Sequence, residues 1–124
     1  MTRKRSPLPA GFGKHGDDPS VIMTAAVQGV SRDPRLSAER AYLAIHTALE
    51  NMAGDTFRTD SAQRAAVGRL AKHSKKLART FNTLKRSLHG ECFYQGACDA
   101  GSAGVAIGKA AEWLTQLPKR LPAK

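Results

Sequence analysis

The segment from residue 61 to residue 90 repeats its apolar side chains every three or four positions, and this spacing constrains the fold more than any other feature of the chain. Residues three and four apart lie on one face of an α-helix, so the pattern predicts one long helix with an apolar packing face. The residues of this predicted face are Leu70, His73, Leu77, Phe81, Leu84 and Leu88. Gly90 is expected to end the helix, because glycine readily adopts the left-handed conformation common at that position.

A second stripe on the same predicted helix carries positive charge. It consists of Arg69, Lys72, Lys76, Arg79 and Arg86, and the segment contains no Asp or Glu. Like charges along a helix repel one another when no acidic side chain lies one turn away, so an external anion is a natural counterpart. The alternative is a solvated face whose aliphatic stems cover the edge of the core. We favour the anion-binding interpretation because the whole chain has a formal net charge of +10.

Composition narrows the fold class and the class of partner. A strongly basic chain suits RNA or DNA, an anionic membrane surface or an acidic protein. Aromatic residues make up only 6% of the 124 residues and alanine is abundant, which favours closely packed helices over a β-sandwich. No apolar run approaches the roughly 18 residues of a membrane span. These features predict one all-α domain without association with a membrane.

Start and stop signals divide the chain into four predicted helices, which we expect to form a four-helix bundle. Asp-Pro dipeptides at 18–19 and 33–34 place an N-cap before a proline in the first helical turn. Asp60, followed three residues later by Gln63, resembles a capping box for the long helix. The expected ends of the four helices are near Ser31, at Gly54, at Gly90 and before Pro118.

The two ends of the chain differ in composition from the middle. Residues 1–17 are rich in proline, glycine and basic side chains, so we predict a flexible basic arm. Residues 18–118 form the predicted bundle, and residues 119–124 form a basic tail. The N-terminal segment lacks the apolar run of a secretory signal. We therefore expect a cytoplasmic protein in which Cys92 and Cys98 are reduced thiols.

The candidates for metal or catalytic chemistry lie where the long helix is expected to end. His89, Cys92, Cys98 and Asp99 could supply zinc ligands, but their spacing lacks the paired Cys-x2-Cys of common structural sites. Either cysteine would need an imidazole and an orienting group to act as a nucleophile. No glycine-rich phosphate loop of either standard kind is present. We therefore expect neither a metal nor a cofactor.

Several aromatic and histidine side chains have structural interpretations. Trp113 is expected to anchor the core, and His73 and His46 to be hydrogen-bonded structural histidines. Phe93 and Tyr94 could either stack on a nucleic-acid base or cap the bundle.

Two stretches of the sequence resemble the HEPN-like helical-bundle superfamily of nucleotide-associated and RNA-associated domains found in toxin–antitoxin and defence systems. They are residues 40–49 (RAYLAIHTAL) and residues 77–96, where a helix ending in Leu88-His89 is followed by an aromatic pair and a glycine. The resemblance implies a four-helix bundle, dimerisation and association with RNA. The ribonuclease members of that superfamily carry an arginine a short, defined interval before a histidine.

The arginine–histidine pairs of this chain fit the ribonuclease pattern poorly. Arg86 is too close to His89, and Arg79 is too far from it. Arg40 and His46 have a suitable interval, but one such pair is expected by chance in a chain with this many arginines. The resemblance therefore implies RNA association better than it implies nuclease activity.

The leading hypothesis is a non-enzymatic basic bundle that binds the backbone of RNA or DNA through the charged stripe. It would act as a homodimer or within a larger nucleoprotein or defence complex. The first alternative is a HEPN-type, metal-independent ribonuclease or toxin, with His89 and Arg86 as the catalytic pair and Tyr94 close by. The second alternative is an interaction module for an acidic partner protein.

Overall fold

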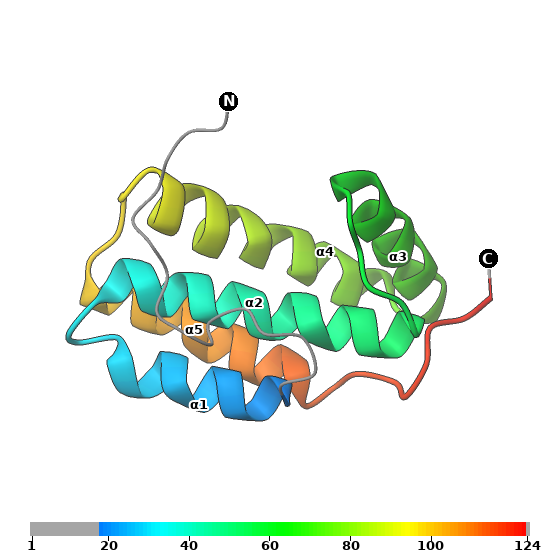
Figure 1. The fold of residues 1–124 in the computed structure, drawn as a ribbon, viewed down its shortest axis with the longest axis horizontal. Helices are drawn as coiled ribbons and strands as arrows, with labels where there is room; N and C mark the ends of the chain where they lie inside the picture. Colours follow the sequence, from blue (N-terminus) through cyan, green and yellow to red (C-terminus); the bar gives the residue numbers. More distant parts are fainter. Residues whose placement is uncertain (1–17, 124) are drawn as a thin grey trace.

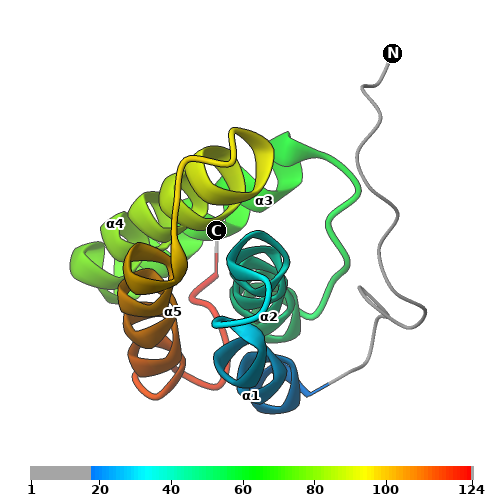
Figure 2. The same cartoon turned by 90° about the vertical axis from the view of Figure 1, so that its left-hand side faces the viewer.

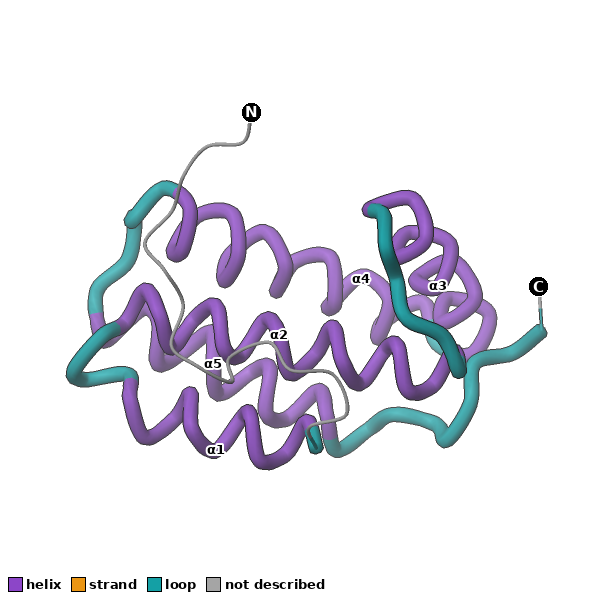
Figure 3. Tube along the Cα trace, viewed as in Figure 1, coloured by secondary structure: helices purple, strands orange, loops and turns teal. Residues whose placement is uncertain are grey.

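The computed structural model describes residues 18–123, which form helices joined by short loops, with no strand in that range (Figures 1 and 3). The α-helices are α1 (Pro19–Gly29), α2 (Pro34–Ala53), α3 (Asp60–His73), α4 (Lys75–Leu84) and α5 (Ala100–Leu114). α4 continues directly into a π-helix, η1 (Lys85–Tyr94). The predicted all-α class is confirmed, whereas the predicted arm at 1–17 lies outside the described residues. No helix within 18–123 has the length and apolar character needed to cross a membrane.

α2 is the central helix of the bundle. The helices α1, α2, α5 and the continuous rod of α4 and η1 lie side by side (Figure 2). α3 lies at one end of this group, where it contacts α4 and α2 (Figure 1). α2 contacts α1, α3, α5 and η1. Its buried face is rich in small residues, which allow neighbouring helices to approach closely. These residues are Ala38, Ala41, Ala44 and Ala48.

The starts of the first two helices follow the sequence signals. The carboxylates of Asp18 and Asp33 accept hydrogen bonds from backbone N–H groups two and three residues later, at 2.9 and 3.1 Å, and so cap α1 and α2. Gly54 ends α2 with a φ of 70°, as predicted. At the start of α3 the cap is Thr59 rather than Asp60, and its hydroxyl accepts a hydrogen bond at 3.1 Å.

The predicted single helix over residues 61–90 is wrong. Ser74 is extended, with φ −157° and ψ 112°, and it ends α3 and begins α4. Its hydroxyl accepts a hydrogen bond from the N–H of Leu77 at 3.1 Å, which stabilises the start of α4. The break turns α3 so that Ala66 and Leu70 are buried between helices. His73 was predicted on the apolar face, but it is exposed because it lies at the break.

The rod also does not end at Gly90. It continues through η1, and at the end of η1 the N–H of Gln95 donates to the carbonyl of Gly90, five residues earlier, at 3.1 Å. A π-helical turn is wider than an α-helical turn, so side chains beyond Leu84 are rotated relative to a continuous α-helix. The loop before α5 is therefore short, and Asp99 caps α5 through a capping box with Ser102.

The core contains the predicted tryptophan anchor. Trp113 is 2% exposed, its indole N–H donates to the carbonyl of Leu77 at 2.9 Å, and its ring contacts Phe81 with centroids 5.5 Å apart.

The predicted basic tail packs against the bundle through residues 119–123. Leu121 is buried, and its N–H donates to the carbonyl of Met52 at 3.1 Å. The segment after α5 therefore packs against the end of α2.

Gly68, in the middle of α3, gives a prediction about stability. An added Cβ would meet nothing within 4 Å, and glycine inside a helix costs about 1 kcal/mol relative to alanine. Gly68→Ala is therefore expected to raise the free energy of unfolding by about 0.5 to 1 kcal/mol in urea denaturation. Gly54→Ala is the control and should lower stability, because its φ of 70° disfavours a side chain. A loss of stability in Gly68→Ala would contradict the finding that the space beside Gly68 can hold a methyl group.

Candidate functional site

The exposed side of α4 and η1 carries a row of basic side chains. Lys76, Arg79 and Arg86 are exposed, as predicted, and Lys75, which lay outside the predicted stripe, joins them. We call these four residues the α4 basic surface. At about 1.5 Å per residue they extend over roughly 15 Å of the rod. The other side of α4 is buried through Leu77, Ala78, Phe81 and Leu84.

Arg69 and Lys72 are separated from this surface. They lie on α3 because the chain breaks at Ser74, so the predicted continuous stripe is wrong in this part. Arg69 Nε donates to the carbonyl of Pro122 at 2.8 Å, and Lys72 Nζ donates to the carbonyl of Ala123 at 3.2 Å. Both side chains therefore hold the C-terminal segment against α3.

A groove of about 510 Å³ lies between α3 and α4. Its lining residues are Arg64, Val67, Gly68, Ala71, Lys75, Ala78, Arg79 and Asn82. The lining combines small or apolar side chains with three cations and contains no carboxylate. Of the cations, Arg64 forms an ion pair with Asp60, one turn earlier on α3. We call this feature the α3–α4 groove.

His89 faces a buried glutamate rather than the cysteines. Its Nδ1 lies 2.8 Å from Oε1 of Glu39 on α2, and Tyr42 stacks on the imidazole with centroids 4.5 Å apart. Tyr94 meets the same ring edge-on at 4.7 Å and is 43% exposed. A carboxylate on Nδ1 orients an imidazole and leaves Nε2 for acid–base chemistry, but the same contact also joins α2 to η1. Arg86, the predicted catalytic partner of His89 in the ribonuclease alternative, is exposed on the α4 basic surface.

Gln63 connects this region to a second histidine. Lys85 Nζ donates to Oε1 of Gln63 at 2.6 Å, and since lysine can only donate, the orientation of the amide is determined. Nε2 of Gln63 therefore donates to Oη of Tyr42 and to Nδ1 of His46, each at 2.8 Å. His46 Nδ1 must accept, which places its proton on Nε2, 3.2 Å from the buried carboxylate of Glu50. His46 is thus a hydrogen-bonded structural histidine, as predicted.

Lys85 is half-buried and bonds to the residues around Gln63, so it does not belong to the α4 basic surface. Its Nζ also donates to Oδ1 of Asp60 at 2.5 Å. That hydrogen bond lowers the pKa of Asp60 from its ordinary value. Asp60 is therefore shared between Lys85 and Arg64.

Burial raises the pKa of Tyr42 to about 12 from its ordinary 10, against a smaller lowering effect of the hydrogen bond from Gln63. Between pH 10 and about pH 12 the phenol of Tyr42 is therefore neutral in the folded protein but ionised in the unfolded chain. The resulting stability is fully present below pH 10 and is lost as the pH rises to about 12. Within that window the free energy of unfolding should fall by about 1.4 kcal/mol per pH unit.

Urea unfolding across this alkaline range tests the assignment to Tyr42. Tyr42→Phe removes the titrating group and keeps the ring, so the variant should show a shallower decline than the parent protein. Equal slopes in the two proteins would contradict a buried, neutral Tyr42.

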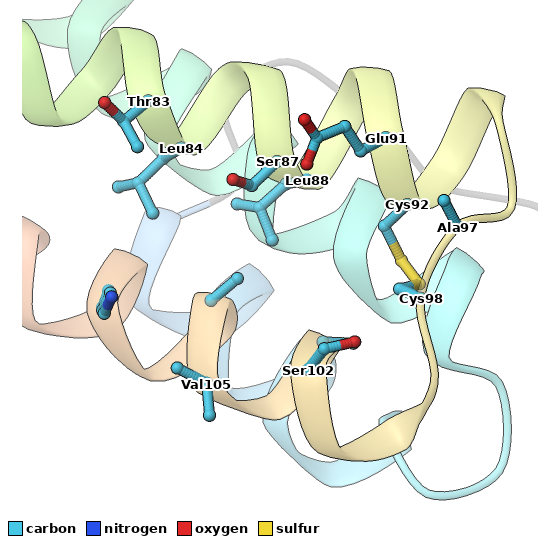
Figure 4. Close-up of a pocket in the computed structure, with 13 residues that line it drawn as sticks. Thr83, Leu84, Ser87, Leu88, Glu91, Cys92, Ala97, Cys98, Ser102 and Val105 are labelled. Atoms are coloured by element: carbon cyan, nitrogen blue, oxygen red, sulfur yellow. A yellow bond between two sulfur atoms is a disulfide. The ribbon is translucent and has the colours of Figure 1, made fainter.

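The prediction of reduced cysteines is wrong, because Cys92 and Cys98 form a disulfide (Figure 4). The end of η1 and the short loop after it bring their Cα atoms to 4.9 Å, within the usual range for such a bond. Stable disulfides are uncommon in the cytosol, so the cysteines no longer support a cytoplasmic location. The bond also occupies two of the four candidate zinc ligands, and His89 is hydrogen-bonded to Glu39. Within residues 18–123 no three metal-ligating side chains converge.

A cleft of about 240 Å³ opens beside the disulfide, between the rod and α5 (Figure 4). Hydroxyl groups of Thr83, Ser87 and Ser102 line it, together with one acidic and one basic side chain, Glu91 and Lys109. It contains no histidine. His89, the histidine of the ribonuclease alternative, is therefore not part of this cleft.

One polar stripe was missed at the sequence level although its signal was present. Glu39, Tyr42, His46 and Glu50 recur at helical spacing along the alanine-rich α2, and all four bond within the region around Gln63 and His89.

No protein-family model, curated protein or solved structure matches the chain. The assignment of a function therefore depends on the arrangement of its own residues.

Proposed function

We propose that this protein binds the sugar-phosphate backbone of RNA or DNA through the α4 basic surface, as a non-catalytic subunit of a nucleoprotein or defence complex. The proposal includes assembly as a homodimer or with other proteins. The resemblance to HEPN-like domains makes RNA the first nucleic acid to test. We leave Arg69 and Lys72 out of the proposed interface, because their side chains donate to backbone carbonyls of the C-terminal segment.

The exposed, one-sided charge of α4 carries this proposal. Lys75, Lys76, Arg79 and Arg86 are all exposed along the continuous rod of α4 and η1, and α4 contains no acidic residue. A length of roughly 15 Å corresponds to about four nucleotide steps along one strand of a duplex. Flexible basic side chains at that spacing neutralise phosphates without reading base edges. We therefore expect little preference for sequence.

Salt titration tests the proposal. If about four phosphates are neutralised, raising the salt concentration from about 50 to 200 mM should weaken binding to duplex DNA about a hundredfold. The loss should be about fiftyfold for single strands, because fewer counterions are released per phosphate. Fluorescence anisotropy with a labelled duplex and a labelled single-stranded RNA measures both values. An affinity that does not change over this range would contradict backbone binding.

The non-catalytic part of the proposal needs its own assay. Labelled single-stranded and structured RNA would be incubated without metal ions with the parent protein and with His89→Ala. We expect intact RNA with reduced mobility on a native gel for both proteins. Cleavage by the parent that disappears in His89→Ala would overturn this part in favour of a ribonuclease, with the imidazole held by Glu39 as its general base.

A further inference from the structure

The α3–α4 groove differs from the α4 basic surface because it has an apolar floor. Val67, Gly68, Ala71 and Ala78 form that floor, and Arg64, Lys75 and Arg79 stand around it. Its volume of about 510 Å³ falls in the range typical of ligand-binding clefts. Phosphate contacts gain little from an apolar floor, so the groove suits a different ligand from the one proposed for the α4 basic surface.

Gly68 keeps the groove open. It is an exposed residue in the middle of α3, and the space where its Cβ would lie is empty to 4 Å. Ala71 and Ala78, on either side of the break at Ser74, also have short side chains. A longer side chain at position 68 would therefore fill the space between the two helices.

We infer that the α3–α4 groove binds an acidic amphipathic helix of a partner protein. Such a helix would place two or three apolar side chains on the floor and its Asp and Glu residues near Lys75 and Arg79. Helices commonly bind in grooves between two helices through apolar residues spaced three or four apart. The partner would compete with nucleic acid, because Lys75 and Arg79 belong to both sites.

Charge and chemistry select this occupant over the alternatives. The N-terminal segment of this chain and a second copy are both basic and would be repelled by the cations around the groove. An unpaired nucleic-acid base stacks best on an aromatic ring, and the lining residues include none. Of the two guanidinium groups that could take its place, that of Arg64 is already paired with Asp60. An acidic amphipathic helix offers apolar side chains to the floor and carboxylates to the cations around it.

Synthetic peptides provide the test. The probe is a labelled peptide of helical pattern, with Leu at positions three and four apart and Glu at the others; in one control the Glu residues become Lys, and in another the Leu residues become Ser. We expect only the acidic Leu peptide to bind, with amide chemical-shift changes at Gly68, Ala71, Lys75 and Arg79. No binding at about 1 mM peptide would overturn the inference.

Substitutions in the protein separate this inference from the proposed function. Gly68→Leu should weaken peptide binding at least about tenfold and leave RNA affinity within about twofold. Its matched control is Ala65→Leu, also exposed on α3 but outside the groove lining. Lys75→Glu provides a second test if Gly68→Leu is not folded by circular dichroism, and it should weaken peptide and RNA binding together. The inference would be overturned if the groove variants left peptide binding unaffected. It would also be overturned if RNA, but not the acidic peptide, caused chemical-shift changes at the groove residues.

Discussion

Replacing Lys76 and Arg79 together with alanine is expected to weaken binding to duplex DNA about sixtyfold at roughly 0.1 M salt. Each phosphate contact contributes close to a factor of eight at that concentration, through release of its counterion. Both side chains are exposed on the side of α4 opposite Phe81, so their removal leaves the core intact. The slope of the logarithm of affinity against the logarithm of salt concentration should also fall by about two.

The control for this experiment is Lys109→Ala, which removes one exposed cation from α5. It lowers the net charge of the protein without changing the α4 basic surface, and its affinity should stay within about twofold of the parent. Equal losses per removed charge in the two variants would mean that binding follows net charge alone. That result would contradict a defined interface on α4.

Phe81→Ala is expected to lower the free energy of unfolding by about 3 to 5 kcal/mol, a large part of the stability of a domain of this size. Phe81 is fully buried, and its ring contacts Trp113, whose N–H in turn bonds to the carbonyl of Leu77. Truncation leaves a cavity where α4 meets α5, and the hydrogen-bonded indole has limited freedom to fill it. Urea denaturation followed by circular dichroism measures the change.

Lys76→Ala is the matched comparison on the same helix. Its side chain is exposed, so its stability should change by less than about 0.5 kcal/mol. Similar losses of stability from Lys76→Ala and Phe81→Ala would show that the buried and exposed faces of α4 have been exchanged.

Much of the fold could be predicted from local signals. The Asp-Pro starts of α1 and α2, the glycine end of α2 and the burial of Leu70, Leu77, Phe81, Leu84, Leu88 and Trp113 all follow from the sequence. Each of these features depends on residues within one or two helical turns. The exposure of Lys76, Arg79 and Arg86 follows from the same periodicity.

The break at Ser74 shows where periodicity misled the prediction. The apolar spacing continues across it, and serine is both a good cap and an acceptable helix residue, so the local signal was ambiguous. Because of the break, α3 turns away from the line of α4, and in this orientation Ala66 and Leu70 are buried. The turn also lets Gln63 reach Tyr42 and His46, and Arg69 reach the C-terminal segment.

Helical spacing and local hydrogen bonds are enough to predict the all-α class, the caps of the first two helices and the basic, acid-free face of α4. Contacts between distant residues produce the separation of Arg69 and Lys72 from the α4 basic surface, the pairing of His89 with Glu39 and of Cys92 with Cys98, and the α3–α4 groove. These features join residues from separate elements. Their formation depends on how α3 and η1 are oriented in the bundle, and that orientation results from packing across the whole chain rather than from any one segment.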